Sequence, residues 1–200
     1  MAIAIIDDKT TQGLIDSIFR GVLFLVVGVL YKSMLTIHWK KFKQGGFASW
    51  GIIILGAILL QIVISFTKSL LPSVANTVTD NPDTITVSFS LFVISLGPIF
   101  TSLLEDIVFR YTLLHKFFIP NTSIRIVVLV SNSILFGLIH YYNFDQHLIL
   151  TVSFMAAGLF LNLIYIWTRN IWYVLLIHGL NNFVLSTLGI TALWFMQLLN

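Results

Sequence analysis

The chain has 200 residues, of which 58% are hydrophobic and only 10% are charged, with a net charge of +3. An average soluble domain has about 25% charged residues, so this composition excludes a soluble protein of this length. The absence of Cys excludes a disulfide framework, a thiolate nucleophile and a thiolate metal site. These counts predict one integral membrane domain over residues 1–200, an all-α polytopic bundle of transmembrane helices.

Six apolar segments in chain order are of near-membrane length. They are Leu14–Ile37, Phe47–Leu71, Ile85–Phe118, Ile124–Tyr142, His147–Thr168 and Ile171–Ile190. A polar loop over Pro72–Thr84 separates the second segment from the third, and Gly97-Pro98 predicts a kink or a helix restart within the third. The segments lack the alternation typical of a membrane barrel, so about six helical spans are expected.

The basic residues predict the orientation of the bundle. With the N-terminus outside, eight of the 11 Lys and Arg residues fall on the inner side. These eight are Lys32, Lys40, Lys41, Lys43, Arg110, Lys116, Arg125 and Arg169. Arg20 is expected to reach the interface from a span end. The basic cluster at Lys40–Lys43 indicates contact with anionic lipid and not with nucleic acid, so the lipid bilayer is a predicted partner.

Three charged residues interrupt the third apolar segment: Glu105, Asp106 and Arg110. A charge at the bilayer centre costs about 2.5–3.5 kcal/mol on insertion scales, so these residues need partners or a function. Asp106 and Arg110 are four residues apart, a spacing that favours an ion pair on one helical face. Glu105 is turned by about 100° from Asp106 and is therefore predicted to remain available for chemistry.

Two later segments carry matching polar residues. Phe136 and His140 are four residues apart in the fourth segment, and His178 and Asn182 are four apart in the sixth. Counting from the turn between the third and fourth segments puts Glu105 and His140 at similar depth, which predicts a site inside the membrane reached through a water-filled cavity from the inner side. Neighbouring small and polar residues, namely Gly137, Gly179, Asn132 and Ser133, are expected at helix–helix contacts, with cavity lining as the alternative for Asn132 and Ser133.

These strings resemble the motifs of the CPBP family of intramembrane endopeptidases (CAAX prenyl proteases and bacteriocin-processing proteins, also called Abi). The family pattern consists of Glu-Glu-x-x-x-Arg, Phe-x-x-x-His and His-x-x-x-Asn. Here the strings begin at Glu105, Phe136 and His178, in the family's order and spacing. The resemblance covers residues 97–188, the expected catalytic core. Asp106 departs from the family's second Glu, and Tyr111 stands where Gly is common.

The resemblance implies a role for each motif residue. Glu105 would activate a water, His140 would position it, and His178 with Asn182 would stabilise the oxyanion. Asp106, Arg110 and Phe136 would be structural or would orient the substrate. No cofactor is expected, although Glu105, His140 and His178 are also the His2Glu set of a possible zinc site. The His-Glu-x-x-His zinc string is absent.

The sequence thus predicts a multi-pass endopeptidase of the cytoplasmic membrane, acting on a peptide or membrane-protein substrate. The resemblance extends to bacteriocin immunity or peptide maturation. Two other classes remain open. One is a non-catalytic immunity or scaffold protein that keeps the fold, and the other is a small transporter or proton pathway through Glu105, Asp106 and the two histidines. Inverted repeats, common in transporters, are not visible in the sequence.

Overall fold

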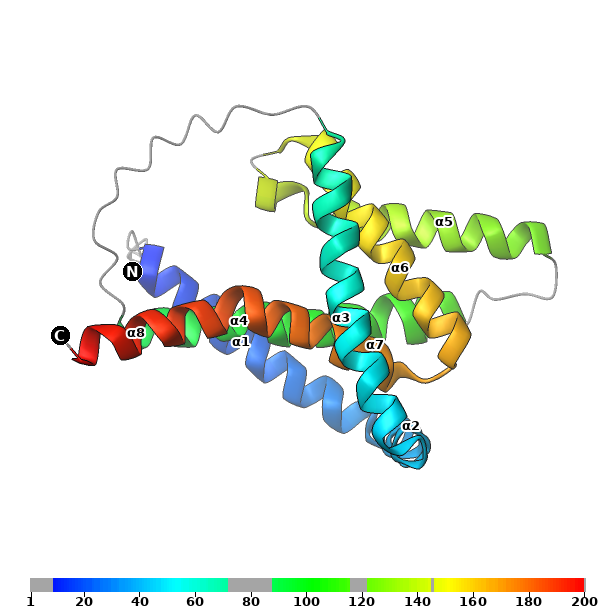
Figure 1. Cartoon of the computed structure of the whole chain (residues 1–200), viewed down its shortest axis with the longest axis horizontal. Helices are drawn as coiled ribbons and strands as arrows, with labels where there is room; N and C mark the ends of the chain where they lie inside the picture. Colours follow the sequence, from blue (N-terminus) through cyan, green and yellow to red (C-terminus); the bar gives the residue numbers. More distant parts are fainter. Residues whose placement is uncertain (1–8, 72–87, 116–121, 145, 200) are drawn as a thin grey trace, which may run out of the picture.

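The computed structural model describes residues 9–71, 88–115, 122–144 and 146–199, and every element in this part of the chain is helical (Figure 1). The polar loop predicted over Pro72–Thr84 lies outside the described residues. The elements are α1 (Lys9–Leu30), α2 (Lys32–Gln44), α3 (Gly46–Ser69), α4 (Phe89–Asp106), the π-helix η1 (Ile107–Leu114), α5 (Thr122–Leu138), the short 3-10 helices η2 (Tyr141–Phe144) and η3 (Leu148–Thr151), α6 (Val152–Thr168), α7 (Ile171–Asn182), the π-helix η4 (Phe183–Leu188) and α8 (Gly189–Leu199).

Five helical stretches among the described residues are long and apolar enough to cross a membrane: Thr10–Leu30, Gly46–Ser69, Phe89–Leu114, Leu148–Thr168 and Ile171–Gln197. The helix α5 is apolar but shorter. The predicted polytopic helical bundle is confirmed. The last span is longer than predicted, because α7, η4 and α8 follow one another without a break and include the apolar tail.

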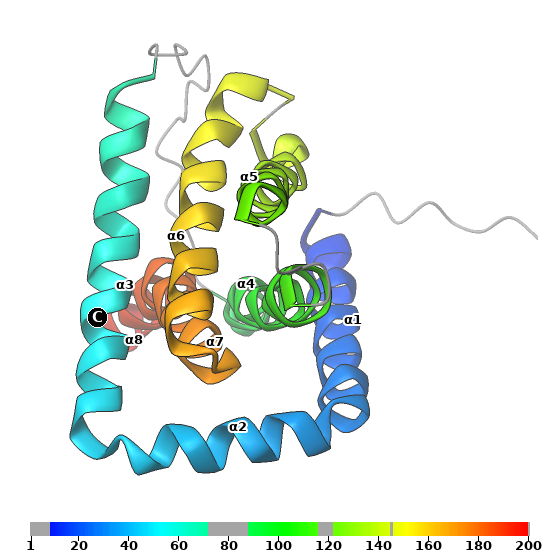
Figure 2. The same cartoon turned by 90° about the vertical axis from the view of Figure 1, so that its right-hand side faces the viewer.

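The first predicted span, Leu14–Ile37, is wrong at its C-terminal end. The helix α1 ends at Leu30, and α2 then runs across the ends of α1 and α3 (Figure 2). The side chain of Trp172 donates to the Leu35 carbonyl at 2.8 Å, and the side chain of Asn170 donates to the His38 carbonyl at 2.9 Å. These bonds attach α2 to the start of α7. Because α2 is rich in lysine, it is too polar to continue the span.

The helix does not restart at Gly97-Pro98, since α4 continues through Pro98 to Asp106, and the kink predicted there as the alternative stays a prediction. A proline inside a helix removes the N–H that would bond the carbonyl four residues earlier. That carbonyl belongs to Ile94, and the hydroxyl of Ser17 on α1 donates to it at 3.1 Å. The change of helix type comes later, at Ile107, where the π-helix η1 begins directly after the two carboxylates. Such π-helical turns are frequent at functional sites.

The helices α5 and α6 pack closely through polar contacts and small residues. The Asn162 amide donates to the Ser133 hydroxyl at 3.0 Å, and the Asn132 amide donates to the Phe109 carbonyl of η1 at 2.9 Å. The predicted helix–helix role of Asn132 and Ser133 is confirmed. At Gly137, a Cβ atom would lie 2.8 Å from both the Met155 nitrogen and the Thr151 carbonyl oxygen.

Replacing Gly137 with Ala is expected to destabilise the protein by about 1–3 kcal/mol, because the new methyl would push against backbone that cannot rotate away. Gly179→Ala is the matched control, since a Cβ there meets only Ser102 Oγ at 3.9 Å, an ordinary contact. Thermal unfolding of both variants in detergent measures the difference. Equal melting temperatures for Gly137→Ala and Gly179→Ala would contradict the close approach of α5 and α6.

Candidate active site

Asp106 and Arg110 form an ion pair with no solvent exposure: Asp106 Oδ1 lies 3.0 Å from Arg110 Nη1. The second carboxylate oxygen, Oδ2, lies 3.3 Å from His178 Nδ1 on α7. The guanidinium also donates to the Gly158 carbonyl at 3.4 Å and lies over the Phe136 ring, with 4.2 Å from its central carbon to the ring centroid. The pair therefore connects α4 and η1 to α5, α6 and α7.

Glu105 faces a different group, as its angular offset from Asp106 predicts. Its Oε1 lies 3.9 Å from His140 Nε2, and both side chains are only slightly exposed. His140 Nδ1 lies 2.9 Å from the Phe136 carbonyl oxygen. Because a carbonyl can only accept, Nδ1 carries the proton, which leaves Nε2 of a neutral ring as an acceptor toward Glu105. The Phe154 ring of α6 packs on the imidazole at 4.3 Å and holds its orientation.

Asn182 has a defined amide orientation at the end of α7. Its Nδ2 donates to the Pro98 carbonyl of α4 at 3.0 Å, and its Oδ1 accepts from the Asn181 amide at 3.3 Å. An amide nitrogen has two hydrogens, so one N–H of Asn182 is not used by the Pro98 contact. This group is a donor at the edge of the site.

One cavity of about 510 Å³ brings three of the predicted residues together: Glu105, His140 and Asn182 all line it. His178 is buried among the described residues and contacts Asp106, and it is not part of the cavity wall. The ion pair of Asp106 and Arg110 likewise lies behind the cavity. The seven predicted site residues thus separate into a group that faces the cavity and a group that supports it.

The helix α1 also contributes to the site, which the sequence motifs do not predict. Arg20 was expected near a span end, but it lies midway along α1 and lines the cavity, paired with Asp16 at 2.7 Å. Its Nη1 also donates to Thr101 Oγ1 of α4 at 2.6 Å. The signal was present, because Asp16 and Arg20 have the same four-residue spacing as Asp106 and Arg110. It was overlooked because a single arginine near an apolar run also fits interfacial anchoring.

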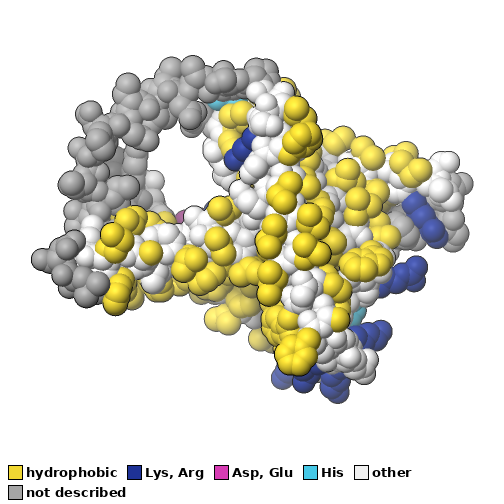
Figure 3. Space-filling model, in the orientation of Figure 1, with side chains coloured by type: hydrophobic (Ala, Val, Ile, Leu, Met, Phe, Trp, Pro, Cys, Tyr) yellow, Lys and Arg dark blue, Asp and Glu magenta, His cyan; other side chains and the backbone are white. Residues whose placement is uncertain are grey.

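The cavity that contains Glu105 is formed by several separate parts of the chain, and its entrance from the inner side stays a prediction. The cavity is lined by the N-terminal half of α1, by α4, by the region after α5 and by the start of α6. These parts lie toward the end of the bundle that carries both termini, whereas the Lys and Arg side chains gather at the other end (Figures 1 and 3).

The zinc alternative does not fit the geometry. Within the described part of the chain, no group of three or more His, Cys, Asp or Glu side chains could hold a metal ion. Of the three proposed ligands, Glu105 and His140 approach each other, but His178 turns its Nδ1 toward Asp106. We therefore derive no chemical step through a metal.

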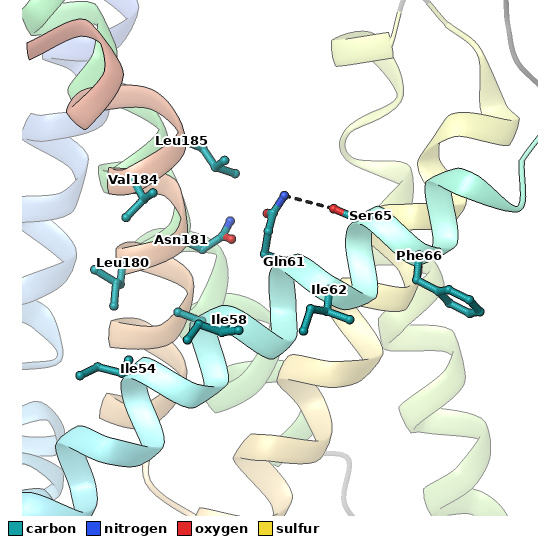
Figure 4. A pocket seen from close by; sticks show the side chains of 11 residues that line it. Ile54, Ile58, Gln61, Ile62, Ser65, Phe66, Leu180, Asn181, Val184 and Leu185 are labelled. Carbon is teal, nitrogen blue, oxygen red and sulfur yellow. Dashed lines mark hydrogen bonds between the residues drawn. The ribbon is translucent and has the colours of Figure 1, made fainter. Parts of the chain in front are cut away.

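A second, apolar groove of about 560 Å³ lies between α3 and the α7–η4 rod (Figure 4). Gln61 of α3 points into it toward Asn181, and its Nε2 donates to Ser65 Oγ at 3.4 Å. The remaining labelled wall residues are apolar, and none can titrate. The adjacent residues Asn181 and Asn182 thus face different cavities, and only Asn182 borders the one with Glu105.

In a comparison with known protein families, residues 87–184 match the family described as type II CAAX prenyl endopeptidase Rce1-like. The matched residues include all three motifs, from Glu105 to Asn182. No curated protein and no solved structure gave a match.

Proposed function

Residues 87–184 belong to the CPBP family, in its Rce1-like group of type II CAAX prenyl endopeptidases, and on this basis we propose that the chain cleaves peptide bonds with a water activated by Glu105. The observation that carries the proposal is the approach of Glu105 Oε1 to His140 Nε2, at 3.9 Å, inside a cavity among membrane helices. Both groups are hydrogen-bond acceptors when Glu105 is ionised and His140 is neutral.

The distance between these acceptors suits a bridging water better than a direct contact. At 3.9 Å the two atoms are too far apart for a hydrogen bond, whereas one water can donate to both. In the proposed reaction, Glu105 takes one proton as the water oxygen forms a bond to the scissile carbonyl carbon. His140 Nε2 accepts a hydrogen bond from the other O–H of the water, which aligns the lone pair of the water oxygen with the carbonyl carbon.

The negative charge then develops on the carbonyl oxygen, where donors stabilise it. We assign this role to the unused N–H of Asn182, because Asn182 lines the cavity. The Nδ1–H of His178 faces Asp106, which leaves Nε2 of a neutral ring as an acceptor, and the ring does not line the cavity, so we assign His178 a positioning role in place of the predicted oxyanion role. Protonated Glu105 returns its proton to the leaving nitrogen as the C–N bond breaks, which yields an amine and a carboxylic acid, and the acid then releases the second water proton to give a carboxylate. Asp106, Arg110 and Phe136 are positioning residues in this scheme.

Replacing His140 with Ala is expected to lower the cleavage rate by about 10²-fold, within the range for groups that assist proton transfer. His147→Ala is the matched control, because His147 is an exposed histidine close by in sequence that does not line the cavity. Cleavage of membrane-anchored peptides by purified protein in liposomes, followed by mass spectrometry, measures both. Equal rates for the two variants would exclude His140 from the mechanism.

The substrate panel should contain prenylated and unprenylated forms of each peptide, and leader peptides of the kind processed in bacteriocin maturation. Cleavage of any member supports the endopeptidase assignment, and the preferred member identifies the substrate class. We propose the cytoplasmic membrane as the location, with the basic end inside. Immunity or scaffolding without cleavage, or proton flux in the same liposomes, would instead support the two non-peptidase classes.

A further inference from the structure

A third cavity, of about 530 Å³, lies at the basic end of the bundle. Residues from four elements form its wall. Most of the polar wall residues carry a positive charge or can be protonated to carry one. They are His38 and Lys41 of α2, His115 after η1, Arg125 of α5, and Tyr165 and Arg169 at the end of α6. The peptidase cavity shares none of these residues.

The elements around this cavity supply no negative charge. The sequences of α2, η1, α5 and α6 contain no Asp or Glu, and the chain has only 8 acidic residues in all. Figure 3 shows Lys and Arg side chains gathered over this end of the molecule. Cations held around a common space repel one another. The same cations would together attract an anion placed between them.

Two residues of the cavity, Arg169 and His38, make hydrogen bonds with the backbone of α6 and α7. Arg169 has a left-handed backbone (φ 49°), and its N–H caps α6 on the Tyr165 carbonyl at 2.8 Å. His38 accepts the Ile171 N–H through Nδ1 at 3.1 Å, so a neutral His38 keeps its proton on Nε2 as a donor. Burial, and then the charges of Lys41 and His115, lower the pKa of His38, which favours that neutral form.

We infer that this cavity binds a phosphate group, as the headgroup of an anionic lipid or as a free phosphate ion. Arginine recognises phosphate through paired N–H donors, and lysine adds a point charge. A phosphate in the cavity would bridge α2, α5 and α6 and relieve the repulsion among Lys41, Arg125 and Arg169. Binding would therefore stabilise the fold by mass action. The inference concerns a separate site and does not rest on the proposed peptidase function.

Thermal unfolding of the full chain in neutral detergent tests the inference, with short-chain phosphatidylglycerol, short-chain phosphatidylcholine and inorganic phosphate as the three probes. Phosphatidylglycerol is expected to raise the melting temperature, and phosphatidylcholine is expected to leave it unchanged because its headgroup is neutral overall. Stabilisation by inorganic phosphate at similar concentration would identify the free ion as the ligand, whereas its failure would identify the lipid. No stabilisation by either anion would overturn the inference.

Removing two positive charges inside the cavity, or two outside it, tests where phosphatidylglycerol binds. The Lys41→Gln/Arg125→Gln variant is expected to weaken phosphatidylglycerol binding about tenfold. The Lys40→Gln/Lys43→Gln variant, which loses the same charge outside the cavity, is expected to change it less than twofold. Equal weakening would mean general surface attraction and would overturn the site. Arg169→Asn, compatible with the left-handed backbone, gives an independent test if the double variant fails to fold. Glu105→Gln should bind the probe like the parent.

Discussion

Replacing Glu105 with Gln is expected to lower the rate of peptide-bond cleavage by about 10²–10⁴-fold, the usual contribution of a positioned general base. The amide has nearly the same shape as the carboxylate, so the cavity and its contact with His140 are kept. It cannot take a proton from water, and for that reason kcat falls while KM changes little. Single-turnover cleavage of the preferred peptide in liposomes, at matched protein levels, measures the effect.

Asp16→Asn provides a matched carboxylate-to-amide change in the same cavity. Asp16 pairs with Arg20, and its side chain is more than half exposed. Its variant is expected to retain kcat within about threefold. Full activity of Glu105→Gln would refute Glu105 as the base, and an equal loss in both variants would point to a general charge effect in the cavity. Unaltered thermal unfolding of Glu105→Gln separates a chemical defect from a folding defect.

Removing one member of the buried ion pair is expected to destabilise the protein by about 3–5 kcal/mol, because the other charge is left without compensation in a low-dielectric environment. Asp106→Ala leaves Arg110, which has no solvent exposure, and also removes the oxygen that faces His178. Arg110→Met leaves Asp106 equally buried. The free energy of unfolding of each variant, from denaturant titration in mixed micelles, measures the loss.

The double variant Asp106→Leu/Arg110→Met is the decisive comparison. Replacing a whole buried pair by apolar residues of similar volume is often neutral or stabilising, so the double variant is expected to recover most of the stability lost in each single variant. A double variant whose losses simply add would show that the two charges do not compensate each other. Cleavage by the stable double variant then reports how strongly the pair positions Glu105 and His178.

Asp106 stands in place of the family's second Glu, and its contacts in the structure show that the shorter side chain keeps its partners. The shorter carboxylate still reaches Arg110 with one oxygen and approaches His178 with the other. Tyr111, in place of the common Gly, does not line the cavity with Glu105 and packs against His38 and His115, with ring centroids 6.1 and 5.7 Å away. Neither departure adds a side chain to the cavity that contains Glu105.

The sequence by itself determined the membrane class, the helical architecture and which polar and charged residues are candidates for the site. Composition decides that this is a membrane protein, because so few charged residues cannot provide the polar surface that a soluble domain needs. Helical periodicity decides the local pairing of Asp106 with Arg110, since residues four apart share a face. The approach of Glu105 to His140 also followed, from equal rise per residue on two helices that meet at one turn.

Only the tertiary structure decided which side chains face the cavity. The rotation of α7 about its axis turns Asn182 toward Glu105 and buries His178 against Asp106, and no sequence period fixes the rotation of one helix relative to another. The same applies to Arg20, which reaches the cavity because α1 packs along α4, where the Ser17 hydroxyl meets the carbonyl freed by Pro98. The basic cavity likewise depends on contacts between distant elements, because packing, and not local pattern, decides which polar groups share a space.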